Sequence, residues 1–183
     1  MRTVIGVMGS GEDRDAALLE QARELGAAIA GQGWVLLNGG RDRGVMDASA
    51  QGASEAGGLV VGVLPDADSR HASHHLDVAV RTGMGEARNA INALSSDVVV
   101  AMRGGAGTLS EVALALKAGR TVVALDFDPG SGFEAWRTSG LLVLVRSVTE
   151  AIDAVLIALG APTRDMFDSV QATLLSPTDG PPR

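Results

Sequence analysis

The stretch DVVVAMRGGAGTLSE, from Asp97 to Glu111, decides how the rest of the chain is interpreted. It opens with β-branched and small apolar residues, which are typical of a buried strand. A glycine-rich loop from Gly104 to Thr108 follows at once, and apolar residues then recur at helical spacing as far as Leu116. The stretch therefore predicts a strand, a tight loop and a helix, as in a βαβ unit.

The rest of the chain repeats this alternation of short apolar runs and longer segments of helical period. The predicted strands are Thr3 to Met8, Trp34 to Asn38, Leu59 to Leu64, Leu76 to Val80, Asp97 to Met102, Thr121 to Asp126 and Leu141 to Val145. Strands that alternate with helices form parallel sheets. We expect an α/β fold, a Rossmann-like doubly wound and mostly parallel sheet of about seven strands with helices on both faces.

The helix expected from Gly83 to Ser96 matters for function because it carries Arg88. Its buried stripe is expected to consist of Ala87, Ala90, Ile91 and Leu94. Arg88 and Asn92 would lie beside that stripe, one turn apart. A glycine turn precedes the helix, which would place Arg88 near the same edge of the sheet as the other glycine loops.

Length and composition fit a single domain. A chain of 183 residues can bury one core, and an apolar fraction of 46% with only 3% aromatics favours a core of Val, Leu, Ile and Ala. We expect a ligand-binding domain over residues 1–160 and a C-terminal extension over residues 161–183. The extension is expected to be partly helical from Met166 to Leu174 and loose beyond it.

Charge and cysteine content limit the classes of function. The net charge is −7 and no basic stripe is present, so a nucleic acid or a membrane surface is a poor partner and a small ligand is expected. The chain has no cysteine, which excludes disulfides and thiolate metal sites. Gly9-Ser10-Gly11 ends the first apolar segment too early for a signal peptide, so we expect a cytoplasmic protein.

Glycines follow three of the predicted strands, at Gly9, at Gly39-Gly40 and at Gly104. Ligands of parallel sheets bind at the carboxyl ends of the strands, where glycine lets backbone N–H groups approach an anion. The loops therefore predict one phosphate-binding site. In an alternative interpretation they are ordinary tight turns, and Thr108 with Glu111 is a capping box. Neither the dinucleotide fingerprint nor the P-loop signature occurs.

Several motifs in order along the chain carry a resemblance to a known family. They are Gly39-Gly40, Gly44-Val45-Met46, Gly57-Gly58, the run from Thr82 to Asn89 and the run from Gly104 to Glu111. Together they resemble the molybdenum-cofactor carrier proteins and their bacterial relatives. These belong to a wider Rossmann superfamily with the Lonely Guy phosphoribohydrolases, often mislabelled lysine decarboxylases. The likeness extends roughly from Val4 to Asp126.

The resemblance implies a protein that binds a phosphorylated small molecule, of the molybdenum-cofactor or nucleotide type, with the molybdenum cofactor as bound cargo. The implied ligand-binding residues are Gly9, Ser10, Gly39, Gly40, Met84, Arg88, Asn89, Arg103, Gly104, Gly105, Gly107, Thr108 and Glu111. It also implies a homodimer or homotetramer. The helix that carries Arg88, or the stretch from Met166 to Leu174, could supply the contact face.

The alternative function is hydrolysis of the N-glycosidic bond of a nucleoside 5′-monophosphate. The Lonely Guy motif P-G-G-x-G-T-x-x-E is matched from Gly104 to Glu111, and Arg88 stands at the upstream arginine. Arg88 would anchor the substrate, and Glu111 would stabilise a ribosyl cation or activate water. However, Arg103 replaces the motif's proline and Asn89 replaces a lysine, which favours the carrier branch.

Two other chemistries are not supported. Lys117 is the only lysine and is expected in the last turn of a helix, at the wrong end for a pyridoxal Schiff base, so a lysine decarboxylase is not expected. His71, His74 and His75 lie in a polar loop without a familiar zinc spacing, so no metal site is expected there.

Overall fold

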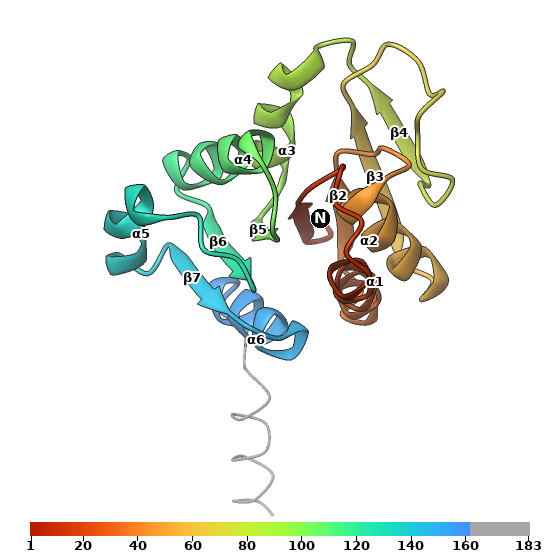
Figure 1. The fold of residues 1–183 in the computed structure, drawn as a ribbon. Helices are drawn as coiled ribbons and strands as arrows, with labels where there is room; N and C mark the ends of the chain where they lie inside the picture. Colours follow the sequence, from red (N-terminus) through yellow and green to blue (C-terminus); the bar gives the residue numbers. More distant parts are fainter. Residues whose placement is uncertain (162–183) are drawn as a thin grey trace, which may run out of the picture.

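The computed structural model describes residues 1–161, which form one domain around a seven-stranded sheet (Figure 1). The strands are β1 Val4–Met8, β2 Val35–Asn38, β3 Leu59–Leu64, β4 Val78–Arg81, β5 Val98–Ala101, β6 Thr121–Leu125 and β7 Leu142–Val145. Every neighbouring pair is parallel, in the order β4-β3-β2-β1-β5-β6-β7. The predicted Rossmann-like α/β fold is confirmed.

Helices cover both faces of this sheet and divide the core into two layers. On one face lie α1 Ala16–Gly31, α2 Gly44–Glu55 and α6 Val148–Ala158, which share one apolar cluster with the strands. On the other face lie α3 Asn89–Ser95, α4 Ala106–Lys117 and α5 Glu134–Thr138 with the 3₁₀ turns Gly85–Arg88 and Ser131–Phe133. The central strands are buried from both sides, which is why their sequences are continuous apolar runs.

The order of the strands reverses between β1 and β5. From β1 the chain proceeds to β2 on one side, and β5 pairs with β1 on the other. The loops that leave these two strands are joined by a hydrogen bond from the Ser10 N–H to the Arg103 carbonyl oxygen, at 3.0 Å. In open parallel sheets this position, at the carboxyl ends of the strands, is where ligands bind.

The predicted buried stripe of the helix from Gly83 to Ser96 holds at Ala90 and Ile91, which are half-buried, with Ile91 packed against the core, but it is wrong at Ala87 and Leu94. Ala87 is exposed and Leu94 is 55% exposed, whereas Arg88, Asn89 and Asn92 are buried. The reason is that α3 packs against the polar N-terminal part of α4, where its side chains find hydrogen-bond partners. Periodicity of apolar residues cannot reveal a polar inner face.

Two further points concern the C-terminal segment and membrane-spanning helices. The predicted extension over residues 161–183 lies outside the described residues apart from Ala161. No helix within residues 1–161 has the length and apolar character needed to cross a membrane.

Candidate functional site

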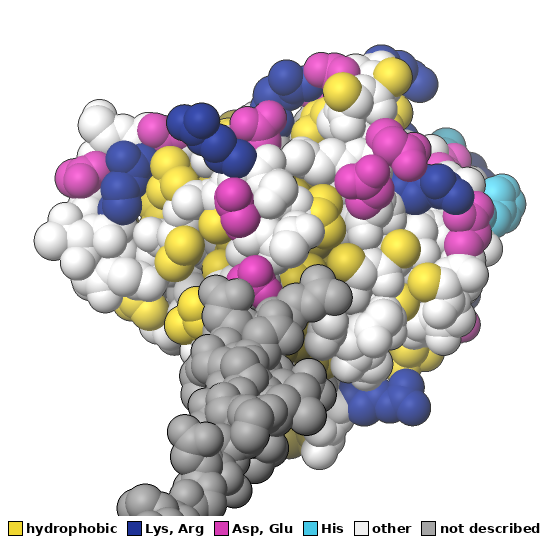
Figure 2. Space-filling view, turned by 90° about the horizontal axis from the view of Figure 1, so that it is seen from below, with side chains coloured by type: hydrophobic (Ala, Val, Ile, Leu, Met, Phe, Trp, Pro, Cys, Tyr) yellow, Lys and Arg dark blue, Asp and Glu magenta, His cyan; other side chains and the backbone are white. Residues whose placement is uncertain are grey.

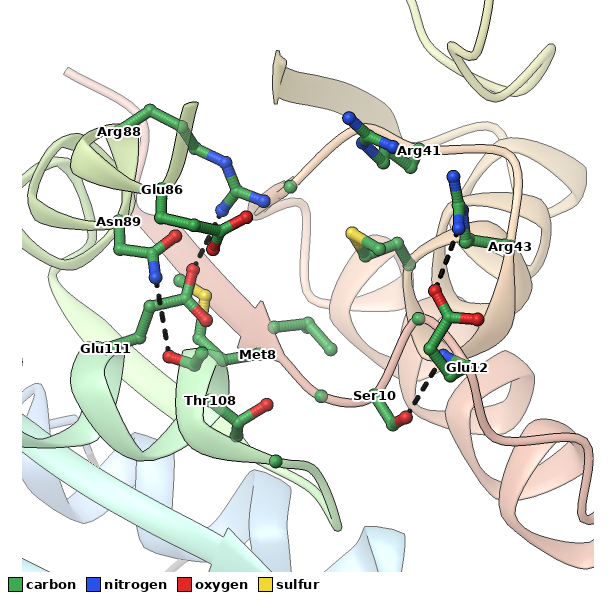
Figure 3. A pocket seen from close by; sticks show the side chains of 17 residues that line it. Met8, Ser10, Glu12, Arg41, Arg43, Glu86, Arg88, Asn89, Thr108 and Glu111 are labelled. Carbon is green, nitrogen blue, oxygen red and sulfur yellow. Dashed lines mark hydrogen bonds and ion pairs between the residues drawn. The ribbon is translucent and has the colours of Figure 1, made fainter. Parts of the chain in front are cut away.

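A cavity of about 410 Å³ opens at the point where the strand order reverses (Figure 3). Its lining comprises the glycines Gly9, Gly11, Gly39, Gly105 and Gly107, the charged residues Glu12, Arg41, Arg43, Glu86, Arg88 and Glu111, and Val7, Met8, Ser10, Met46, Asn89 and Thr108. Helix α4 with the segment carrying Arg88 forms one wall, and the loops after β1 and β2 form the opposite wall. The cavity therefore collects the ends of β1, β2 and β5.

The N-terminus of α4 presents unpaired N–H groups to this cavity. Gly105 is the N-cap, and the first backbone bond of the helix runs from the Leu109 N–H to the Gly105 carbonyl. Within residues 1–161 the N–H groups of Ala106, Gly107 and Thr108 have no acceptor, and no side chain caps the helix. Such a terminus favours an anion.

The capping-box alternative is wrong. Thr108 is the third residue of α4 rather than its N-cap. The Glu111 carboxylate does not fold back onto the Thr108 N–H but accepts hydrogen bonds from the side chains of Arg88 and Asn92. The resemblance of T-x-x-E to a capping box is therefore coincidental here.

Two of the cavity glycines are not required by packing. A Cβ atom on Gly105 would meet nothing within 4 Å, and one on Gly107 would lie 3.7 Å from Glu86 Oε2. By contrast, a Cβ on Gly104 would collide with the Thr108 side chain, and one on Gly39 would lie 2.7 Å from Arg88 Nη2. Gly105 and Gly107 keep space free beside the unpaired N–H groups.

Arg88 and Glu111 form a buried ion pair at the cavity wall. Arg88 Nη1 lies 3.0 Å from Glu111 Oε1, and the two side chains are 8% and 7% exposed. The same oxygen accepts a hydrogen bond from Asn92 Nδ2 at 2.7 Å. Burial raises the pKa of Glu111, and the nearby Glu86 charge adds to this, although the Asn92 hydrogen bond and the Arg88 charge oppose it.

The ion pair leaves bonding capacity on both partners. Arg88 Nε is buried without a hydrogen-bond partner in the described chain, and Arg88 Nη2, beside Gly39, makes no hydrogen bond there either. Glu111 Oε2 accepts no hydrogen bond from residues 1–161. An unpaired guanidinium N–H at a cavity wall is suited to an anionic ligand.

Asn89 has a structural role next to this pair. Its side-chain amide donates to Ser110 Oγ at 2.9 Å and approaches the Gly107 carbonyl oxygen at 3.5 Å. These contacts fasten α3 to the first turn of α4. An asparagine there holds the glycine loop in place without adding a positive charge.

The structure brings most of the expected ligand-binding residues to the cavity. Those in its lining are Gly9, Ser10, Gly39, Arg88, Asn89, Gly105, Gly107, Thr108 and Glu111. Gly40, Met84, Arg103 and Gly104 are not in the lining. Arg103 forms ion pairs with Asp13 at 3.0 Å and Asp15 at 2.8 Å, on the loop that precedes α1. Its charge is therefore directed away from the glycine loop.

Sequence reasoning missed part of the opposite wall. Arg41 pairs with Asp66 at 2.8 Å, and Arg43 pairs with Glu12 at 2.8 Å. Arg41 directly follows Gly39-Gly40 and Arg43 lies two residues further on, and this position was the available signal. Glu86, Met8 and Met46 also line the cavity. Glu86 and Met46 stand in motifs that carry the family resemblance, but only the three-dimensional arrangement shows that they line the cavity.

The three histidines lie between β3 and β4, in the segment from His71 to His75. Within residues 1–161 no group of three or more His, Cys, Asp or Glu side chains is arranged to hold a metal ion. The absence of a metal at these histidines stays a prediction. Lys117 lies in the last turn of α4, as expected.

An all-parallel doubly wound sheet with a glycine-lined cavity where the strand order reverses defines a Rossmann-like ligand-binding domain. The family model described as the SLOG cluster4 family matches residues 2–152, and the chain belongs to this family.

Two solved structures are similar over nearly their whole length. The molybdenum cofactor carrier protein of Chlamydomonas reinhardtii is 46% identical, with a TM-score of 0.81, and the match covers 87% of this chain and 99% of that one. The molybdenum cofactor binding protein from the phototrophic bacterium Rippkaea orientalis is 43% identical, also with a TM-score of 0.81, with 87% and 98% covered. The predicted resemblance is confirmed.

An enzyme is also among the relatives. A cytokinin riboside 5′-monophosphate phosphoribohydrolase of Mycobacterium tuberculosis is 41% identical over 99 residues, which are 53% of this chain and 53% of that protein. This chain thus matches about half the length of that enzyme. Both branches named by the resemblance occur among the similar proteins.

Proposed function

We propose that this protein binds a phosphorylated small molecule in the cavity and acts as its carrier, with the molybdenum cofactor as the cargo that its relatives suggest. The observation that carries this proposal is that the N–H groups without an acceptor at the start of α4 lie beside two glycines, Gly105 and Gly107. Packing of the fold does not require glycine at these two positions. A phosphate can approach such groups closely only where no side chain intervenes.

The charges that line the cavity predict that an anion is held by individual donors and not by an overall positive charge. Three arginines and three glutamates line it, so its formal charges cancel. Affinity for phosphate would therefore come from directed N–H groups and from Arg88, whose Nη2 donates no hydrogen bond within the described residues. Hydrogen bonds to a charged phosphate are stronger than hydrogen bonds between two neutral groups.

The carrier function is favoured over hydrolysis by what surrounds Glu111. Asn89 stands where the hydrolase pattern has a lysine, and its amide is occupied by Ser110. One oxygen of Glu111 is held by both Arg88 and Asn92. The Asn89 amide and this Glu111 oxygen are therefore occupied by hydrogen bonds within the protein.

Hydrolysis of a nucleoside 5′-monophosphate remains the second candidate function, and one observation favours it. Glu111 lines the cavity, its pKa is raised by burial, and its Oε2 accepts no hydrogen bond from the described chain. A carboxyl group whose pKa is raised by burial is a candidate general acid or base. Glu111→Gln should then abolish base release while leaving ligand affinity nearly intact.

The deciding experiment uses the purified protein with a panel of nucleoside 5′-monophosphates, a phosphorylated pterin and the dephosphorylated forms. Melting temperatures should rise more with each phosphorylated compound than with its dephosphorylated form, and no free base should be released. Equal shifts for the two forms would exclude the proposed phosphate site. Base release by the wild type, lost in Glu111→Gln, would establish the hydrolase instead.

Two further expectations belong to this proposal. We expect a homodimer or homotetramer, which light scattering at micromolar concentration would test. A monomer mass would contradict it. We also expect the protein to work in the cytoplasm on a small ligand rather than on nucleic acid. On the face seen in Figure 2, basic and acidic side chains of the described residues are interspersed, and a basic protein surface is what nucleic acids require.

A further inference from the structure

Met46, in the first turn of α2, lies between two glycines of different loops. A Cβ atom on Gly39, after β2, would lie 2.6 Å from Met46 Sδ, and a Cβ on Gly11, after β1, would lie 2.9 Å from Met46 Cε. At either position a side chain would require the Met46 side chain to move. The thioether therefore occupies the space that Gly11 and Gly39 leave open.

Turn geometry does not explain these two glycines. Neither Gly11 nor Gly39 is among the glycines with positive φ. Other residues could adopt their backbone conformations, so what these glycines provide is space, at Gly11 for Met46 and at Gly39 for Met46 and Arg88 together. The position of Met46 is fixed from the other side as well, because the buried Asn38 donates from Nδ2 to the Met46 carbonyl oxygen at 2.8 Å.

Met46 is the apolar side chain that the cavity offers to a ligand. The other apolar lining residues, Val7 and Met8, are 0% and 1% exposed, and the remaining ones are glycines, polar or charged. Met46 is only half-buried, and its sulfur lies beside the guanidinium group of Arg88, since both approach the same point above Gly39.

We propose that Met46, with the Arg88 guanidinium group beside it, forms a surface against which a flat heteroaromatic ring packs, carried by the same ligand whose phosphate binds at the N-terminus of α4. The ligand class is thus a phosphorylated aromatic heterocycle, and Met46 determines specificity for its ring. Thioether sulfur and a guanidinium plane both favour the face of an aromatic ring, whereas a saturated chain would need a larger apolar surface. This inference rests on the proposed phosphate site.

The test separates the ring from the phosphate by using two probes. Guanosine 5′-monophosphate has both groups, and ribose 5-phosphate lacks the ring. Calorimetry should show that the wild type binds the nucleotide more tightly. Met46→Ala should weaken nucleotide binding about 3- to 10-fold, which lies within the range of a sulfur–aromatic contact, and should leave ribose 5-phosphate binding within about twofold. Chromatography should confirm that the nucleotide is intact after each titration.

Two variants serve as controls. Met46→Leu keeps an apolar side chain of similar volume. It should retain most of the difference in affinity between the nucleotide and ribose 5-phosphate. Ile157→Ala removes an exposed apolar side chain from α6, outside the cavity lining, and should change neither affinity. Ribose 5-phosphate binding also reports that Met46→Ala is folded.

Other outcomes overturn the inference in distinguishable ways. Equal affinity of the wild type for the two probes would show that the ring makes no contact with this surface. A Met46→Ala protein that binds ribose 5-phosphate and still binds the nucleotide more tightly, by the same factor as the wild type, would show that the ring does not lie on Met46. If the wild type binds neither probe, the phosphate site itself is wrong.

Discussion

Arg88 Nη1 lies 3.0 Å from Glu111 Oε1 in a pair whose side chains are both more than nine-tenths buried. The partners are not equivalent. A carboxyl group that loses its partner can take up a proton, and the pKa of Glu111 is already raised by burial. A guanidinium group cannot lose its proton under ordinary conditions. Removing one or the other should therefore have unequal consequences.

We predict that Glu111→Ala destabilises the protein by about 3–5 kcal/mol, because it leaves the Arg88 charge buried and unpaired. Arg88→Met should cost clearly less, since Glu111 can become neutral. Urea unfolding of the two variants at neutral pH would compare them. If Arg88→Met proves as costly as Glu111→Ala, the proposed escape by protonation does not operate.

The raised pKa of Glu111 also predicts how stability depends on pH. Its pKa lies above the usual 4.5 in the folded protein, so the folded state holds this proton to higher pH than the unfolded state does. The resulting contribution to the free energy of unfolding is complete below the unfolded pKa and is lost as pH rises through the folded pKa. Glu111→Gln should remove it.

Unfolding of the wild type and of Glu111→Gln should be compared from about pH 4 to about pH 8. The wild type should lose stability relative to the variant as the pH rises. A wild type that instead gains on the variant over this range would mean that the attraction of Arg88 outweighs burial and that the pKa of Glu111 is lowered.

The parts of this molecule that local pattern determines were predictable from the sequence. Apolar runs such as Val98 to Ala101 are long enough to be recognised as buried strands, and the glycines after them mark the ligand edge of a parallel sheet. The inner face of α3 was not predictable, because Asn92 is buried through a hydrogen bond to Glu111, nineteen residues away in the chain. Neither was the direction of Arg103, which depends on carboxylates near α1.

Glu86 lines the cavity close to the proposed phosphate position, since its Oε2 lies 3.7 Å from where a Gly107 Cβ would be. Its negative charge should oppose a bound phosphate. We predict that Glu86→Gln tightens ribose 5-phosphate binding by roughly fivefold, the effect of about 1 kcal/mol for charges about 4 Å apart in water. The gain should shrink with added salt.

The matched control for this change is Glu24→Gln, which removes the same charge from α1, outside the cavity lining. It should alter the affinity little. Titrations at low and high salt would measure both variants. Tighter binding in both variants would show that net charge, and not the position of Glu86, is responsible. Unchanged affinity in Glu86→Gln would place the phosphate away from Gly107.

The sharpest test of the anion site is Gly105→Ser, because it should move two properties in opposite directions. Gly105 is the N-cap of α4, with φ −94° and ψ −154°, and a Cβ atom there would have open space around it. Serine favours this position, and its hydroxyl can accept from the unpaired N–H groups that follow. The ligand-free variant should therefore be more stable, by a few tenths of a kcal/mol. The same hydroxyl would occupy the donors and the space that a phosphate needs, so the rise in melting temperature with guanosine 5′-monophosphate should largely disappear.

Gly132→Ser, at another glycine with open space but outside the cavity lining, should leave that rise intact. A Gly105→Ser protein that is stabilised by the nucleotide as much as the wild type would show that the phosphate binds elsewhere.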